Sequence, residues 1–207
     1  PLHDATMYGE AGADVVKLLA GHGADVNAED LLGGMPLDFA MFDERMDVIT
    51  ALLDCGAKAD RTRRFDGTTV LHATVSMGML NIVMEFINRG VDVNVRDRDR
   101  QTPLHEAAWA DDRAMVELLL DHGAKINVTD RNADTPGHVA AVNGYAELLD
   151  LLMSRGADTR AKNNQGLTPL DLARSATSFQ MIVLSAPSAS PYSVIVTNPR
   201  AIRGLVR

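Results

Sequence analysis

The sequence predicts an all-α solenoid in which one helix pair is repeated six times along the chain. Two short markers recur with one common spacing, and the apolar content is mostly Ala, Leu, Val and Met, with only 4% aromatic residues. A fixed period of about 20 to 50 residues is typical of stacked repeats and outweighs local propensity as a guide to the fold. Small apolar residues suit the thin layers of helices in such a stack.

The first marker is a Pro-Leu-His triplet or a close variant of it. Its copies begin at intervals of 35, 34, 33, 33 and 33 residues. They are Pro1-Leu2-His3, Pro36-Leu37-Asp38, Val70-Leu71-His72, Pro103-Leu104-His105, Pro136-Gly137-His138 and Pro169-Leu170-Asp171. A Thr before the Pro, as at Thr102-Pro103, indicates the start of a helix, because the N–H that Pro lacks has no partner at the first helical position.

The second marker is a Gly that closes each of the first five repeats. Its copies stand at intervals of 33, 34, 33 and 33 residues, at Gly23, Gly56, Gly90, Gly123 and Gly156. In the fourth repeat, Val116–Leu120 is apolar on one face, and Gly123 suits the left-handed conformation that ends a helix. Each repeat is therefore expected to contain two antiparallel helices and a projecting loop.

This pattern resembles the ankyrin repeat, whose signature Thr-Pro-Leu-His-x-Ala is matched in full at residues 102–107 and closely at 168–173. The resemblance covers residues 1–184, with repeats starting near residues 1, 30, 64, 97, 130 and 163. It implies an ankyrin-repeat solenoid of antiparallel helix pairs with projecting β-hairpin fingers, and a concave groove between the fingers and the first helices. Residues 185–207 are expected to form a linker and a basic tail that either caps the last repeat or regulates binding.

Charge and cysteine content restrict the classes of function. The formal net charge is −8, so we do not expect a nucleic-acid ligand, which requires dominant positive charge. The one cysteine, Cys55, cannot form an internal disulfide, and we therefore expect a reducing compartment, the cytoplasm or the nucleus. No apolar run approaches the roughly 20 residues that span a bilayer, so membrane insertion is not expected.

No residue is expected to act in catalysis or to hold a metal or cofactor. All six histidines occupy repeat positions. Equivalent residues of successive repeats lie roughly 8–10 Å apart, too far for joint coordination of a metal at about 2 Å. Cys55 stands beside the Gly56 cap, and the pattern places no His or Asn to activate its thiol. Asn27, Asn94 and Asn127 match the hairpin asparagine of the family and are expected to form structural hydrogen bonds.

The predicted apolar contacts share one position, six residues after the Pro of each repeat. The resemblance implies that this position and the finger tips contact partners. Repeats two to six carry Phe42, Ser76, Trp109, Val142 and Ser175 there. We predict that Phe42, Trp109 and Val142 bind the partner, because large apolar side chains contribute disproportionately to interface energy. For Trp109, the alternative is that the indole covers the seam between repeats.

The predicted fingers carry arginines on an otherwise acidic chain. The predicted partner-binding residues are Arg63, Arg64, Arg96, Arg98, Arg100 and Arg131. Stacked fingers would join them into a basic ridge that favours a partner with an acidic or phosphorylated segment, although a solvated charged loop is the alternative. Arg100 and Ala133 replace the glycine of other fingers and Asp111 replaces a turn glycine, so reshaped turns are expected.

The sequence therefore predicts a non-enzymatic protein–protein interaction module that binds a partner segment across its concave face and basic fingers. The alternative is a substrate-positioning accessory domain of a larger enzyme or effector protein. The fold class alone does not decide between them.

Overall fold

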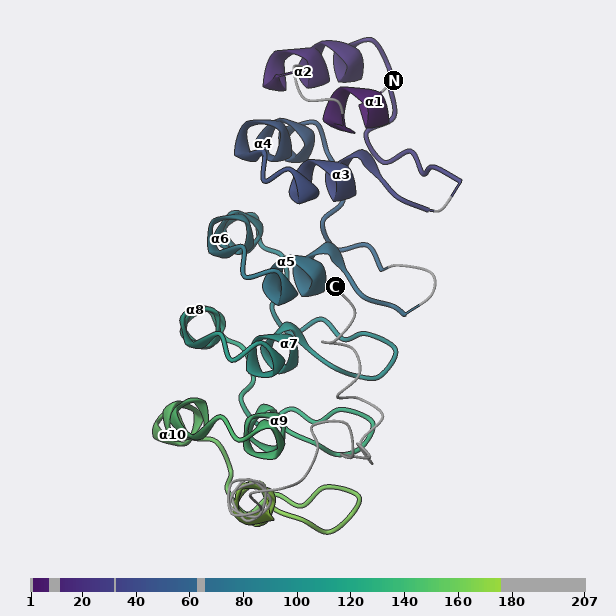
Figure 1. Ribbon diagram of the computed structural model, residues 1–207. Coiled ribbons are helices and arrows are strands. Elements are labelled where there is room, and N and C mark those ends of the chain that lie inside the picture. The colour runs from purple at the N-terminus through teal and green to yellow at the C-terminus, as the bar shows by residue number, and fades with distance from the viewer. Residues whose placement is uncertain (1, 8–11, 32, 63–65, 176–207) are drawn as a thin grey trace, which may run out of the picture.

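A computed structural model describes residues 2–7, 12–31, 33–62 and 66–175, and they form a stack of helix pairs (Figure 1). The inner helices, which follow the fingers, are α1 (Leu2–Met7), α3 (Pro36–Phe42), α5 (Val70–Ser76), α7 (Pro103–Trp109) and α9 (Pro136–Asn143). The outer helices are α2 (Ala13–Gly21), α4 (Met46–Asp54), α6 (Leu80–Asn88), α8 (Arg113–Asp121) and α10 (Ala146–Ser154). Residues 169–175 are again helical. The predicted all-α stack of paired helices is confirmed.

The core repeats with the same period as the sequence. Leu37, Leu71 and Leu104 of the inner helices are fully buried. The outer helices contribute a second buried column, which consists of Leu52, Phe86, Leu119 and Leu152. Each pair has one apolar face, and only the neighbouring pair can cover it, so stability arises from the interfaces between repeats.

A buried histidine joins one inner helix to the next finger. In the fourth repeat, Nδ1 of His105 accepts a hydrogen bond from the N–H of Thr102, 3.1 Å away. Since Nδ1 is the acceptor, Nε2 carries the proton and donates to the carbonyl oxygen of Asp134, at 3.1 Å. His72 and His138 make the same pair of bonds. Burial lowers the pKa of His72, and it lowers the pKa of His105 to about 4.

An asparagine ladder joins the outer parts of neighbouring repeats. Nδ2 of Asn94 donates to the carbonyl oxygen of Gly123 at 3.1 Å, and its Oδ1 accepts from the N–H of Lys125 at 2.8 Å. Asn27 and Asn127 make equivalent bonds. The structural hydrogen bonding expected of these asparagines is confirmed, and its partners lie in the following repeat.

The junction between the second and third repeats differs from the others in both linking positions. Asp38 stands where the other linking repeats have His, and Asp60 stands where the ladder has Asn. A carboxylate accepts hydrogen bonds only, so neither residue can donate to a carbonyl oxygen of the third repeat. The backbones of α3 and α5 also approach each other less closely than those of α1 and α3, α5 and α7, or α7 and α9 (Figure 1).

The fingers are hairpin-like loops closed by backbone hydrogen bonds. In one of them, the N–H of Asp97 donates to the carbonyl oxygen of Gln101 at 3.0 Å. Within the described ranges no strand is formed, and a single β-bridge joins Thr62 to Thr69. The reshaping expected at Arg100 and Ala133 does not occur, because both adopt the left-handed conformation, with φ of 62° and 59°. The closing hydrogen bonds of the finger impose that conformation on non-glycine residues.

Asp111 likewise keeps the left-handed turn between inner and outer helices, with φ of 53°, so the reshaping expected there is absent too. Two sets of predicted residues lie outside the described residues: Arg63 and Arg64 of one finger, and the tail at 185–207. In the described part of the chain, no helix has the length and apolar character needed to cross a membrane.

Candidate partner-binding surface

The inner helices present an interrupted apolar column at their carboxyl ends. Phe42, the last residue of α3, is 62% exposed, and Val142 near the end of α9 is 39% exposed. Trp109 ends α7 but is half-buried and packs against the core. The three residues hold equivalent positions at or near the carboxyl ends of inner helices, each in its own repeat. Phe42 and Val142 are thus open for contact, and Trp109 offers a smaller surface.

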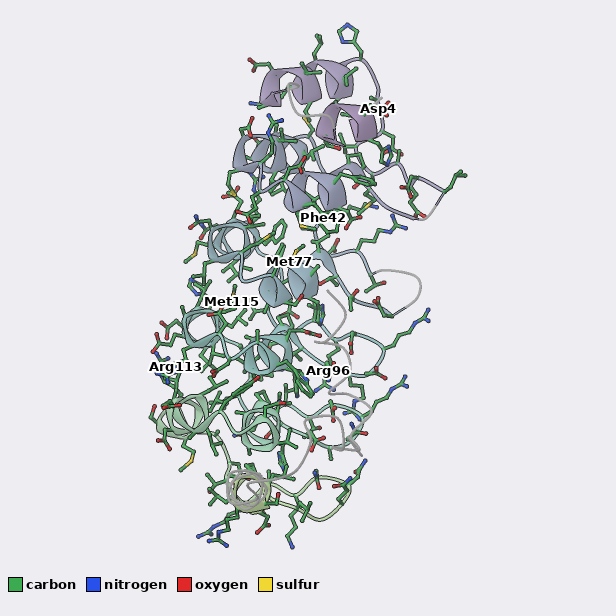
Figure 2. The ribbon with its side chains drawn as sticks, viewed as in Figure 1. Asp4, Phe42, Met77, Arg96, Arg113 and Met115 are labelled. Carbon is green, nitrogen blue, oxygen red and sulfur yellow. The ribbon has the colours of Figure 1, made fainter. Side chains whose placement is uncertain are left out.

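The structure adds a residue that the sequence argument missed. Met77, which follows α5, is 43% exposed and lies beside Phe42 (Figure 2). Together they border a pocket of about 200 Å³ between α3 and α5. Its other lining residues are Asp38, Met41, Ala73 and Ser76. The substitution of Asp for His at position 38 was the sequence signal for an unusual junction here.

Consecutive fingers stack through main-chain hydrogen bonds. The N–H of Arg98 donates to the carbonyl oxygen of Asp66, and the N–H of Arg131 donates to that of Asp99, both at 2.9 Å. In the next pair of fingers, the N–H of Asn164 donates to the carbonyl oxygen of Asn132, also at 2.9 Å. The side chains of Arg96, Arg98, Arg100 and Arg131 are all exposed along this row.

Carboxylates neutralise some of the arginines of the fingers. Arg131 forms an ion pair with Asp99 of the preceding finger at 3.5 Å, and Arg61 pairs with Glu29. Exposed pairs of this kind are worth about 1 kcal/mol or less, so a partner can replace them at little cost. Within the residues that the structure describes, Arg96 and Arg100 form no ion pair.

The opposite end of the inner helices is acidic. Asp43 and Glu44 follow α3, and Asp111 follows α7; all three are exposed. An inner helix of seven residues is about 10 Å long, so its finger and its acidic turn lie at opposite ends. A segment lying across the inner face would therefore meet arginines at one end, apolar side chains in the middle and carboxylates at the other end.

Comparison with known proteins identifies the repeats. A family model described as ankyrin repeats (3 copies) matches residues 37–130, and one described as ankyrin repeat matches residues 1–31. The structure also matches the crystal structure of the ankyrin repeat domain of Bcl-3, described as a unique member of the IkappaB protein family. The TM-score is 0.78 at 32% identity, over 88% of this chain and 81% of that one. The chain belongs to the ankyrin repeat family.

Similar ankyrin repeats occur within proteins of very different length. Neurogenic locus notch homolog protein 1 of Xenopus laevis is 34% identical over 119 residues, which are 58% of this chain and 5% of that protein. The putative ankyrin repeat protein FPV223 of fowlpox virus is 28% identical over 119 residues, 58% of this chain and 81% of its own length. This chain therefore spans only a small fraction of the notch homologue.

The buried histidines of this ankyrin repeat chain serve its own structure. In the described ranges, no three His, Cys, Asp or Glu side chains gather in a group that could hold a metal ion. His72, His105 and His138 are occupied in joining repeats. Cys55 is half-buried at the end of α4. Ankyrin repeat domains are generally protein-interaction modules.

Proposed function

We propose that this ankyrin repeat chain is a non-enzymatic module that binds a segment of another protein across its inner face. Phe42, Trp109 and Val142 supply the apolar contacts. The finger arginines, Arg63, Arg64, Arg96, Arg98, Arg100 and Arg131, favour a segment that is acidic or phosphorylated at the end lying against the fingers. Arginine forks suit carboxylate and phosphate oxygens, which accept two parallel hydrogen bonds.

The exposure of Phe42 carries this proposal. Its side chain is 62% exposed, although the same helix buries Leu37, Ala40 and Met41 almost completely. An exposed Phe leaves apolar surface in water, whereas aromatic side chains in a covered interface contribute strongly to binding. The neighbouring Met77 enlarges the exposed apolar surface at the same place.

Affinity capture from a source-cell lysate tests the proposal. The native chain is compared with a Phe42→Ala, Trp109→Ala variant, and bound proteins are identified by mass spectrometry. A Leu80→Ala, Met153→Ala variant is the matched control, because these side chains are each 37% exposed on outer helices. A protein held by the native chain and the control, and lost by the inner-face variant, supports the proposal. A protein held equally by all three contradicts it.

The finger contribution is tested separately by charge. An Arg96→Gln, Arg100→Gln variant is expected to bind the captured partner several-fold more weakly and with a smaller salt dependence. Lys58→Gln, Lys125→Gln is the control that removes the same charge, because these exposed lysines follow outer helices and not finger tips. Equal loss in both variants would mean that net charge matters and the finger position does not.

A further inference from the structure

The pocket between α3 and α5 arises from the unusual junction of the second and third repeats. The histidine-to-carbonyl bond is unavailable there because position 38 is Asp, and the two inner helices lie farther apart than their counterparts. Met41 of α3 and Ala73 of α5 line the resulting space, together with the exposed Phe42 and Met77. No other pair of inner helices in the described residues shows this combination of an Asp at the linking position and a wide spacing.

The size of the pocket restricts its occupant. A pocket of about 200 Å³ is smaller than the roughly 300–1,000 Å³ that drug-sized ligands require. It is comparable to an engineered apolar cavity of about 150 Å³ that binds benzene. A single large side chain such as Leu, Met or Phe therefore fits it, and methionines in the lining can adjust to the shape of that side chain.

The surroundings of the pocket are acidic on the side of the helix turns. Asp43 and Glu44 directly follow Phe42 and are exposed. Asp112 of the fourth repeat reaches Gly78, the residue after Met77: a Cβ on that glycine would lie 3.5 Å from its Oδ2. The nearby Arg45 is already paired with Asp47 at 3.1 Å, an interaction that also lowers the pKa of Asp47. The carboxylates beside the pocket thus favour positive charge on an arriving segment.

We propose that this pocket receives one Leu, Met or Phe side chain of a partner segment that carries Lys or Arg within the next two residues. This inference rests on the proposed function and specifies the segment that the inner face selects. The basic residue lies over Asp43 and Glu44, while any acidic part of the segment points the other way, toward the finger arginines.

The test is selection of a phage-displayed random dodecapeptide library on the full chain. The native chain is compared with Ser76→Leu, which fills the pocket from one of its exposed lining residues. Ser175→Leu is the matched control: Ser175 is the equivalent exposed residue of the sixth repeat, and both hydroxyls donate to a carbonyl oxygen three residues earlier. Both variants must keep the cooperative helical melt of the native chain.

We expect selected peptides to share a large apolar residue followed by Lys or Arg. Their affinity should fall at least tenfold for Ser76→Leu and stay unchanged for Ser175→Leu. An Asp43→Asn, Glu44→Gln variant should bind them several-fold more weakly. In methyl NMR spectra of methionine-labelled native chain, the signals of Met41 and Met77 should shift when a selected peptide is added.

Three results would overturn the inference. The first is that peptides bind Ser76→Leu as tightly as the native chain, which means that they do not use the pocket. If Trp109→Ala still abolishes the binding of these peptides, the proposed function holds although the pocket inference fails. Selection of no common sequence by the native chain also overturns the inference, while lysate capture judges the proposed function independently. The third result concerns the chain without peptide. If its Met41 and Met77 signals shift on dilution, the pocket is occupied by a second copy of the chain. If they shift on Ile195→Asp, a change within residues 185–207, the pocket is occupied by the tail.

Discussion

His105 and Asp134 lie in successive repeats and are joined by a hydrogen bond from Nε2 of the imidazole to the carbonyl oxygen, 3.1 Å away. The opposite ring nitrogen accepts from the N–H of Thr102. One buried side chain thus caps its own helix and holds the following finger. The same arrangement at His72 and His138 makes buried imidazoles part of the framework that carries the inner face.

Replacing His105 by Ala should lower the free energy of unfolding by about 2–4 kcal/mol, because it leaves a cavity and strands the N–H of Thr102 and the carbonyl of Asp134. His122→Ala is the control. Its exposed imidazole bonds to the carbonyl oxygen of Leu118 in its own helix and does not reach another repeat, so a loss of about 0.5 kcal/mol or less is expected. Urea unfolding measures both, and equal losses would contradict the linking role.

Stability should decrease as the pH falls from about 6.5 toward 4. His105 has a pKa of about 4 in the folded chain against 6.5 as its ordinary value, so the unfolded chain takes up the proton first. The linkage slope is at most about 1.4 kcal/mol per pH unit for each such histidine, and the pKa of His72 is lowered as well. Urea unfolding at pH 7 and pH 5 measures the loss. The slope should be smaller in His105→Ala, and equal stability at both pH values would refute the argument.

Gly67→Ala should destabilise the array more than Gly166→Ala. Both glycines hold the same finger position with positive φ, 72° and 76°. A Cβ at Gly67 would lie 2.9 Å from the backbone nitrogen of Arg98, whereas a Cβ at Gly166 has nothing within 4 Å. The left-handed conformation alone costs about 1–2 kcal/mol, and the clash at Gly67 should add about 1–3 kcal/mol. Chemical unfolding measures the free energy of unfolding of both variants. Equal losses would mean that the neighbouring finger moves away from position 67 at no cost, contrary to the tight stacking of the fingers.

Asp60→Asn should strengthen the junction of the second and third repeats. An amide at this position can donate to the carbonyl oxygen of Gly90, as Asn94 donates to that of Gly123. The expected gain is about 1 kcal/mol, and the reverse change Asn94→Asp should lose at least as much. Thermal unfolding gives both values. If Asp60→Asn were neutral and Asn94→Asp strongly destabilising, the second junction would be too wide for the bond to form.

The period of the sequence was sufficient to predict the paired helices, because Thr-Pro starts and Gly ends recur in fixed register. It also predicted that the fingers stack, which the bonds from Arg98 and Arg131 confirm. For Trp109 the sequence left two alternatives open, partner contact or cover of the seam between repeats, and it could not decide how far the indole is buried, since that depends on the shape of neighbouring repeats. The conformation of Arg100 was wrongly expected to change, because hydrogen bonds of the finger outweigh its own preference.

The pocket was beyond prediction for a related reason. Its lining comes from α3 and α5, so it depends on the spacing between two repeats, and no single repeat contains it. Asp38 and Asp60 each break the pattern at a linking position. Only the structure shows that both changes affect the same junction and that the inner helices are widely spaced there.

Photo-crosslinking tests the central claim most directly. A benzoylphenylalanine is placed at Val142 on the inner face or at Met153 on the outer helix of the same repeat, and each chain is irradiated in lysate. The two sites are matched in exposure, at 39% and 37%. Binding on the inner face predicts a covalent adduct with one partner from position 142 and none from 153. An adduct formed from position 153 alone, or equally from both, would contradict it.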